Sequence, residues 1–254
     1  MTLQLPYLEG HRQDGPSSTC HIAGPHLRDL LASPSHGVPG AEESYGERVA
    51  QYYGVHPENP QPRTLNQMVQ ILGDDGLIAY PTDSCYALGC ALGNSSGIER
   101  IRRIRHLGDK HHFTLVVSEF AQLGAFVEMD NWVFRAVKAA TPGPYTFILK
   151  ATREVPKMTQ HPKKRTIGVR IPKHRTTLAL LDALGSPLVS STLLLPDHPE
   201  PLADGWTIKE LLDHEVDAVL DSGDCGLTPT TVVDLSGEEP EVVRIGAGDP
   251  APFQ

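Results

Sequence analysis

Hydrophobic positions recur with a helical period in several stretches of the chain from about residue 56 onwards. Apolar residues spaced three or four positions apart predict one buried face of an amphipathic helix. Pro62 suits a first helical turn, and Asn94 or Ser95 can cap a second helix through its side-chain oxygen. This spacing predicts helices near 62–72, 95–105, 132–140, 176–184 and 207–213.

Short apolar runs that end at turn residues alternate with these helices and predict strands. They fall at 77–80, 113–117, 145–151, 166–171, 188–193, 218–220, 231–235 and 242–245. Strands and helices interleave without strict alternation, which is typical of a mixed sheet rather than a purely parallel one. We therefore expect an α/β fold in which helices pack on a twisted mixed sheet in a single domain.

Residues 1–54 have a different composition, with seven Gly, five Pro and only one brief apolar cluster around Leu30. Such a segment buries too little apolar surface to offset the entropy of ordering it. We predict a mostly disordered extension over 1–54 and a folded domain over 55–254. Val49 is an alternative start of the translated chain, which the intact mass of the native protein tests.

Charge is distributed unevenly along the chain. The net charge is −9, yet the segment 98–175 holds sixteen Lys or Arg against six Asp or Glu. Surface charges more than about 8 Å apart are largely screened at physiological salt, so a concave basic site responds mainly to its own neighbours. The segment 98–175 therefore favours an anionic partner, although most of its bases individually solvate helix faces.

Few features point to a membrane or to a bound metal. The chain has no apolar run of about 18 residues and no basic start of signal-peptide type, so we expect a cytoplasmic protein. Its four Cys are scattered and lack zinc-finger spacing, which predicts reduced thiols and no metal at Cys. His106, His111 and His112 lie in a polar loop, where solvent-facing His are more common than metal ligands.

The run YPTDSCYALGC, from Tyr80, places a hydroxyl-rich turn directly after a buried apolar strand. Pro81 lacks the amide that a central ladder needs, so strand pairing is expected to stop there. Thr82, Asp83 and Ser84 then lie on a loop, where they can contact a small polar substrate. The same residue types also occur in ordinary strand-ending turns, because they bond to their own backbone.

The chain lacks the two common glycine-rich nucleotide loops, and it lacks a nucleophile elbow and a His-Glu-x-x-His motif. A set of cations and hydroxyls at predicted strand ends remains. Arginine's forked donors match phosphate and carboxylate oxygens, so this set suits a small anionic ligand or a nucleoside triphosphate. Its members are Thr82, Ser84, Arg103, Arg105, Thr166, Arg170, Ser190, Thr192, Thr231 and Arg244.

The order of these segments resembles the YrdC-like superfamily, the threonylcarbamoyl-AMP synthase family, over about 56–253. YPTDSCYALGC matches its strand and turn, and further matches follow in family order: RRIRHL, TPGPYTFIL, TIGVRIP, SSTLLLP, TPTTVVDL and VRIG. HPENPQPR, the DKHHFTL loop and SSTLLLP are similar to the YciO-type branch. The resemblance implies a YrdC-like twisted mixed sheet.

The resemblance also implies an activity: L-threonine, bicarbonate and ATP give threonylcarbamoyl-AMP and pyrophosphate with the assistance of Mg²⁺, for tRNA t6A modification. This is the reaction of a nucleotidyltransferase. Carried over residue by residue, the threonine pocket is Ser84, Ser118, Arg170, Ser190 and Thr231. The ATP site is Arg103, Arg105, Thr166, Thr192 and Arg244, with Arg103 and Arg105 as the catalytic pair and no protein-bound metal.

Some positions depart from the family pattern. Arg103 replaces a Lys, Ala87 replaces a Gly, and Leu194 stands where the family has an Asn. Each lost hydrogen bond to a charged group reduces binding by about 1.5 to 3 kcal/mol, which weakens turnover or changes the substrate. Two alternatives therefore stay open: a module that binds double-stranded RNA or tRNA, and a pocket that binds nucleotide without turnover.

Overall fold

A computed structural model describes residues 49–254 of the 254-residue chain, except for 109, 199 and 224. The described part belongs to one unit, Tyr45–Gln254. The predicted extension over 1–54 lies mostly outside the described residues. Its last four residues form strand β1 (Gln51–Gly54), so ordered structure begins before the predicted boundary at residue 55.

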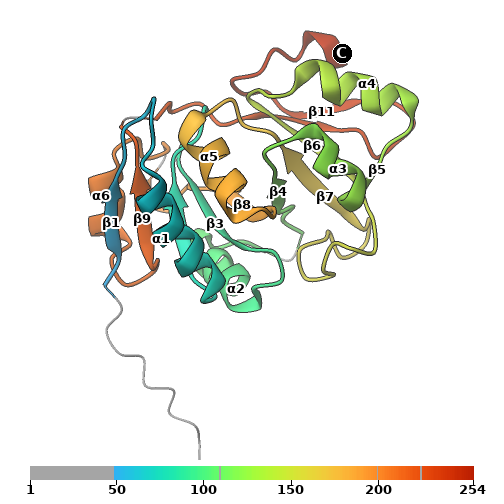
Figure 1. Cartoon of the computed structure of the whole chain (residues 1–254). Coiled ribbons are helices and arrows are strands. Elements are labelled where there is room, and N and C mark those ends of the chain that lie inside the picture. Colours follow the sequence, from blue (N-terminus) through green and yellow to red (C-terminus); the bar gives the residue numbers. More distant parts are fainter. Residues whose placement is uncertain (1–48, 109, 199, 224) are drawn as a thin grey trace, which may run out of the picture. The chain divides into compact units, whose positions relative to one another are not determined.

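The described residues form eleven strands and six α-helices (Figure 1). After β1 the strands are β2 (Leu77–Tyr80), β3 (Ala87–Ala91), β4 (Thr114–Val116), β5 (Val127–Glu128), β6 (Tyr145–Ala151), β7 (Thr166–Arg170), β8 (Leu188–Thr192), β9 (Ala218–Asp221), β10 (Thr231–Asp234) and β11 (Glu241–Arg244). The helices are α1 (Pro62–Gly73), α2 (Ser95–Arg105), α3 (Phe120–Phe126), α4 (Asn131–Ala140), α5 (Arg175–Leu184) and α6 (Gly205–Leu211), followed by a 3-10 turn at Ala251–Phe253.

The strands form one mixed sheet in the order β1-β9-β2-β3-β8-β4-β7-β6-β10-β11. The short strand β5 lies outside this order and pairs with β6. β2 pairs in parallel with β9 and antiparallel with β3, and the pairs β4/β7 and β6/β10 are also parallel. β1 extends the sheet by pairing in parallel with β9. The predicted single-domain α/β fold with a mixed sheet is confirmed.

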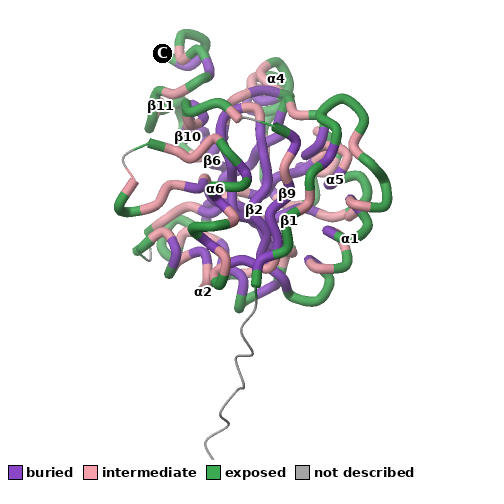
Figure 2. Tube along the Cα trace, turned by 90° about the vertical axis from the view of Figure 1, so that its left-hand side faces the viewer, coloured by how far each residue is buried: buried purple, intermediate pink, exposed green. Residues whose placement is uncertain are grey.

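Side chains alternate between the two faces of the sheet, as the strand period requires. In β2, Leu77 and Ala79 join the larger hydrophobic cluster, whereas Ile78 and Tyr80 join the smaller one. The smaller cluster is covered by α1 and α5, which lie side by side in Figure 1, and the larger one includes residues of α2 and α6. Figure 2 shows the central strands buried between exposed loops and helix surfaces.

Helix α2 illustrates how local sequence fixes one element of the site. Asn94 caps its start by accepting a hydrogen bond from the Gly97 amide at 2.7 Å, and its side-chain amide donates to the Asp75 carbonyl at 2.8 Å. Ile98, Ile101 and Ile104 face the core as predicted. The helix ends at Arg105, whose guanidinium contacts Ser191 on β8 and the Leu194 carbonyl just after that strand.

Four elements were not predicted from the sequence: β1, β3, α3 and β5. β3 lies within the run that we interpreted as a turn, and it contains Ala, Gly and Cys rather than β-branched residues. It forms a strand because β2 and β8 pair with it on both sides, and such pairing overrides intrinsic preference. α3 begins with a capping box between Glu119 and Gln122.

Candidate active site

The loop after β2 is held in one conformation by the Thr82 hydroxyl. This hydroxyl donates to the Cys85 carbonyl at 2.6 Å, and it accepts from the Ser84 and Cys85 amides at 3.2 and 3.3 Å. β2 ends at Tyr80, immediately before Pro81, as predicted. The bonds made by Thr82 direct Asp83 and Ser84 towards the end of β7.

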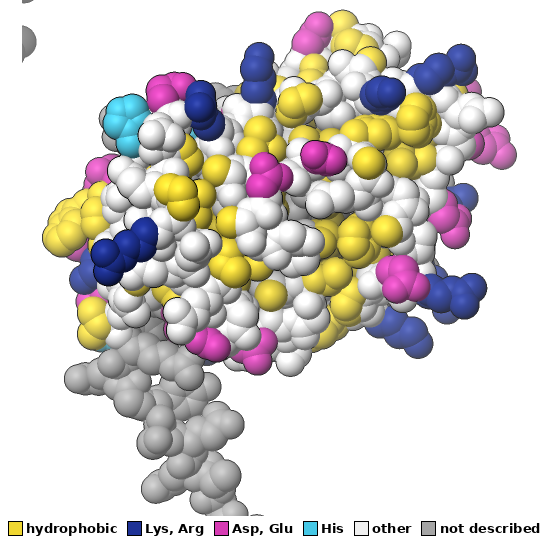
Figure 3. All heavy atoms as spheres, viewed as in Figure 1, with side chains coloured by type: hydrophobic (Ala, Val, Ile, Leu, Met, Phe, Trp, Pro, Cys, Tyr) yellow, Lys and Arg dark blue, Asp and Glu magenta, His cyan; other side chains and the backbone are white. Residues whose placement is uncertain are grey.

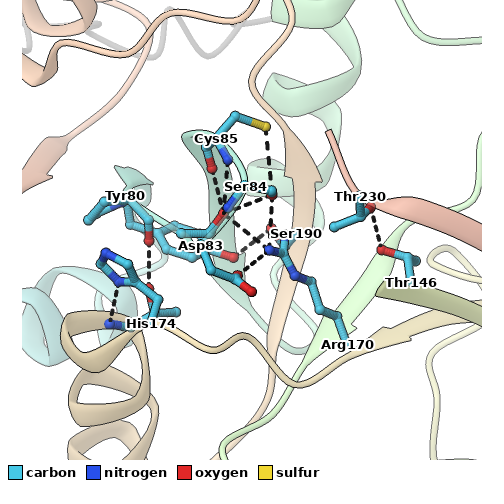
Figure 4. Close-up of polar contacts among 12 residues, drawn as sticks. Tyr80, Asp83, Ser84, Cys85, Thr146, Arg170, His174, Ser190 and Thr230 are labelled. Carbon is cyan, nitrogen blue, oxygen red and sulfur yellow. Dashed lines mark hydrogen bonds and ion pairs between the residues drawn. The ribbon is translucent and has the colours of Figure 1, made fainter. Parts of the chain in front are cut away.

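Arg170, the last residue of β7, meets this loop (Figure 4). Its Nη2 donates to the Asp83 carboxylate, to Ser84 Oγ at 3.0 Å and to Thr82 Oγ1 at 3.3 Å. The Arg170 side chain is 7% exposed, and both Arg170 Nε and Asp83 Oδ2 are buried with no hydrogen-bond partner among the described residues. The structure thus brings Ser84 and Arg170 into direct contact, as the predicted threonine pocket requires.

Ser190 lies deeper in the sheet, behind this loop. Its hydroxyl donates to the Leu88 carbonyl at 2.9 Å, so the Tyr80 hydroxyl, 2.6 Å away, must donate to Ser190 Oγ. Burial raises the pKa of Tyr80 to about 12, which keeps this donor protonated at neutral pH. The hydrogen-bonding capacity of Ser190 is thus largely used within the protein interior.

A cavity of about 440 Å³ opens beside this region. Cationic and hydroxyl groups line most of it, and three aliphatic side chains form an apolar wall. The lining comprises Arg105, Lys110, His111, His112, Thr114, Thr146, Ile148, Ser191, Thr192, Thr230, Val232, Val243 and Arg244. Three of the predicted ATP-site residues, Arg105, Thr192 and Arg244, therefore share one cavity. A volume of this size is within the range that holds a nucleotide-sized ligand.

Arg105 and Arg244 are each fixed by contacts with the protein. Arg105 Nη1 donates to Ser191 Oγ, and its Nε donates to the Leu194 carbonyl at 3.4 Å. Arg244 donates to the Thr230 carbonyl from Nε at 3.0 Å and from Nη2 at 2.8 Å. Burial, with the charge of Arg244, lowers the pKa of Arg105 to about 10, so it remains charged at neutral pH.

The guanidinium groups of Arg170, Arg244 and Arg105 all act on the buried thiol of Cys85. Burial is the dominant effect and raises the pKa of this thiol, whereas each of the three positive charges lowers it. The charge of Arg170 also lowers the pKa of Arg244, after the larger effect of burial. Thr114, which lines the cavity, lies on β4 two positions before Val116, the partner of Arg170 on β7, so the Arg170 loop and the cationic cavity are neighbouring parts of one positively charged site.

Two histidines that we expected to face solvent instead line the cavity. His111 Nε2 lies 3.0 Å from Ser191 Oγ, and His112 Nε2 lies 2.9 Å from Thr166 Oγ1. The His112 ring also stacks on His161, with 4.7 Å between the ring centroids. Sequence reasoning missed these residues because a polar loop gives no periodic signal of burial.

The other predicted site residues lie in different surroundings. Thr166 is buried against His112, and Thr231 is buried with its hydroxyl donating to the Gly248 carbonyl at 2.5 Å. Ser118 lies at the start of α3, where its amide donates to Gln122 Oε1 at 3.1 Å. Arg103 is 61% exposed and pairs with Glu215 at 2.7 Å, so the structure does not bring it to the cavity.

Two further findings concern the part of the chain that the structure describes. None of its helices is long and apolar enough to cross a membrane. It also contains no cluster of three or more His, Cys, Asp or Glu side chains with the arrangement of a metal site.

The fold and site define a small α/β protein with a cationic cavity at the ends of several strands, and comparison with known proteins gives it a family. The Sua5/YciO/YrdC family model, described as "Telomere recombination", matches residues 70–246. The chain is 46% identical over 205 residues to YciO of Escherichia coli, covering 81% of this chain and all of YciO. This chain belongs to the Sua5/YciO/YrdC family.

Solved structures and a more distant relative agree with this assignment. The crystal structure of E. coli YciO superposes with a TM-score of 0.79 over 81% of this chain and 100% of that chain. A threonylcarbamoyl-AMP synthase of Coxiella burnetii is 30% identical over 182 residues, which are 69% of this chain and 95% of that protein. P. abyssi Sua5 complexed with L-threonine is 22% identical and has a TM-score of 0.70 over 77% of this chain and 57% of that chain. It shares the fold.

Proposed function

We propose that this protein is a threonylcarbamoyl-AMP synthase, which converts L-threonine, bicarbonate and ATP into threonylcarbamoyl-AMP and pyrophosphate. The observation that carries the proposal is the junction of two polar sites. A buried arginine with an adjacent hydroxyl, Arg170 with Ser84, adjoins through β4 a cavity that contains Arg105 and Arg244. The related synthase of C. burnetii supports the choice of reaction.

The cavity suits a nucleoside triphosphate because it has two chemically different walls. Ile148, Val232 and Val243 supply an apolar surface for a base, whereas Arg105 and Arg244 supply forked donors for phosphate oxygens. Positive charge that is already in place stabilises negative charge developing on the phosphates, without reorganisation during the reaction. Catalysis by positioning and electrostatics requires no strong acid and base pair.

The chemistry can be divided between the two sites. Arg170 and Ser84 would hold the threonine, whose amine and bicarbonate would first give the carbamate and water. A carbamate oxygen would then attack the α-phosphorus of ATP, while pyrophosphate leaves beside Arg105. The described cavity lining contains no carboxylate, so Mg²⁺ would be bound by phosphate oxygens and water rather than by protein ligands. When bound, the ion would supply further charge neutralisation on the phosphates.

The experiment that tests this proposal measures pyrophosphate release and adenylate formation with ATP, bicarbonate and Mg²⁺ across all amino acids. We expect release that depends on both threonine and bicarbonate. Arg105→Ala should reduce it by about ten- to a hundredfold, because a charged contact of about 1.5 to 3 kcal/mol is lost. Product formation with another amino acid but not with threonine would reject the substrate. The absence of any adenylate would reject the reaction.

Binding to double-stranded RNA or tRNA is a second candidate function, and the β6–β7 connection favours it. Arg153, Lys157, Lys163 and Arg165 are all exposed there. Figure 3 shows Lys and Arg side chains close together at the lower right, where Figure 1 draws this connection, whereas elsewhere on that face they are dispersed among acidic ones. A salt titration separates the two functions, since RNA binding through several phosphates weakens steeply with salt. Charge reversal at Lys163 and Arg165 should then abolish RNA binding and leave pyrophosphate release unchanged.

A further inference from the structure

Ser191 Oγ is the meeting point of two basic side chains from different parts of the fold. Ser191 lies on β8 and is 4% exposed. Arg105, at the end of α2, donates to this oxygen from Nη1, and His111, on the loop before β4, places Nε2 at 3.0 Å from it. All three residues line the cavity. None of this cluster except Arg105 belongs to the predicted ATP site.

The protons in this cluster can be counted. A guanidinium has no acceptor, so Arg105 donates to Ser191, and Ser191 has a single hydroxyl proton of its own. When His111 is neutral, its Nε2 can accept a hydrogen bond from the Ser191 hydroxyl. When His111 is protonated, Nε2 becomes a donor, and two donors then point at Ser191 Oγ. The serine hydroxyl must in that case turn away, and the cavity is the side that remains open to it.

The surroundings of His111 determine its protonation state in the protein without ligand. Burial is the largest effect, and together with the charges of Arg105, His112, Arg102 and Arg244 it lowers the pKa of His111 to about 4. Arg105 and Arg102 come from α2, Arg244 from β11, and Lys110 lines the same cavity. His111 is therefore neutral at pH 7 without ligand, and the negative charge of a polyanion beside it favours the protonated form and opposes the effect of these cations.

We propose that His111 takes up a proton from solvent when a polyphosphate enters the cavity, and that Ser191 thereby becomes a hydrogen-bond donor to that ligand. The inference rests on the proposed function only in choosing a polyphosphate as the ligand. The proton returns to solvent when the ligand leaves. The cluster would thus favour highly charged phosphates over singly phosphorylated ones, and it would bind them more tightly at lower pH.

Calorimetry with inorganic triphosphate tests this without any turnover. The full-length protein is titrated at pH 6.5 in three buffers of different ionisation enthalpy, so that the buffer dependence of the heat gives the number of protons taken up. We expect wild type to take up more than His111→Gln, by up to one proton. Glutamine keeps a polar group near Ser191 but cannot be protonated. His106→Asn, at an exposed helix end in left-handed conformation, is the matched control and should behave as wild type.

Affinity gives an independent measurement. Between pH 6 and 7.5 the wild-type affinity should fall relative to His111→Gln by up to about tenfold per pH unit, as linkage requires for one proton. Comparison with the variant cancels the titration of triphosphate itself. Ser191→Ala should bind more weakly at each pH and still take up the proton. Circular dichroism confirms that each variant is folded.

Equal proton uptake in wild type and His111→Gln would overturn the proposal, and so would triphosphate that does not bind wild type at pH 6.5. Neither result decides the reaction, which the pyrophosphate assay with threonine tests separately. Conversely, proton uptake that persists in a protein without adenylate formation would leave the cluster as a polyphosphate-binding device in a protein of another activity.

Discussion

Asp83 and Arg170 form an ion pair that is almost completely removed from solvent, with side-chain exposures of 12% and 7%. It joins the loop after β2 to the end of β7, two segments that are 87 residues apart in the chain. Arg170 also donates to two loop hydroxyls, while Arg170 Nε and Asp83 Oδ2 have no hydrogen-bond partner within the described part of the chain. The pair therefore has a structural role in addition to any contact with substrate.

The first prediction follows from this burial. Asp83→Ala should lower the free energy of unfolding by about 3 to 5 kcal/mol, because it leaves the Arg170 charge buried without a counter-charge. Urea denaturation measures the change. Glu58→Ala is the matched control, since it removes an exposed partner of Arg175 and should change stability by less than about 1 kcal/mol. Similar losses in the two variants would contradict the structural role of the pair.

Arg103 and Arg105 should differ strongly, although they are two residues apart on α2. Arg103→Ala removes a surface ion pair with Glu215 and should change ATP affinity by less than about fivefold, equivalent to under about 1 kcal/mol. Arg105→Ala removes a cation that lines the cavity. Titration with ATP compares the two variants. A larger loss for Arg103→Ala would show that this arginine turns towards the ligand.

Stability should fall as the solution is acidified from about pH 6.5 to about pH 4. The unfolded chain binds a proton on His111 near its ordinary pKa of 6.5, whereas the folded protein, with this pKa lowered to about 4, does not. The unfolded state therefore gains protons first, and acid favours it throughout this window. Urea midpoints measured at several pH values should fall less steeply in His111→Gln. His112 and His174, whose pKa values burial also lowers, contribute to the remaining slope.

Asn94 should be one of the more sensitive positions outside the cavity. Asn94→Ala removes both the cap of α2 and the bond to the Asp75 carbonyl, and should reduce stability by about 2 to 4 kcal/mol. Asn94→Asp keeps an acceptor for the Gly97 amide, so a smaller loss is expected. Thermal unfolding monitored by circular dichroism distinguishes the two. An equal loss would mean that the cap itself contributes little.

Most of the sheet could be predicted from the sequence, because apolar runs such as 145–151 and 188–193 carry a clear strand signal. The elements that were missed have weak local signals. β3 is rich in Ala and Gly and depends on its neighbours, and β1 is short and largely exposed. In both, pairing with distant residues determines the structure, and a single sequence does not display such pairing.

The candidate site was likewise predicted only in part from the sequence. The loop after β2 and its contact with Arg170 were anticipated from residue types and their order. Ser191 was not, because the prediction selected its neighbours: Thr192, at the end of β8, also lines the cavity, whereas Ser190 faces the other side of the sheet. The Ser190 hydroxyl is used by Leu88 and Tyr80, whereas Ser191 contacts Arg105 and His111. The placement of Arg103 depends on which side of α2 the cavity lies, which helical spacing alone does not specify.

The pairing of β1 with β9 has a practical consequence for shortened versions of this protein. A chain that begins at residue 55 would lack β1, and the backbone hydrogen-bonding groups of Ala218 to Asp221 on that side of β9 would be exposed. An exposed edge strand can pair with a strand of another chain, so the truncated protein would be prone to self-association. Any shortened version meant for crystallisation or binding work should therefore retain Val49 to Gly54.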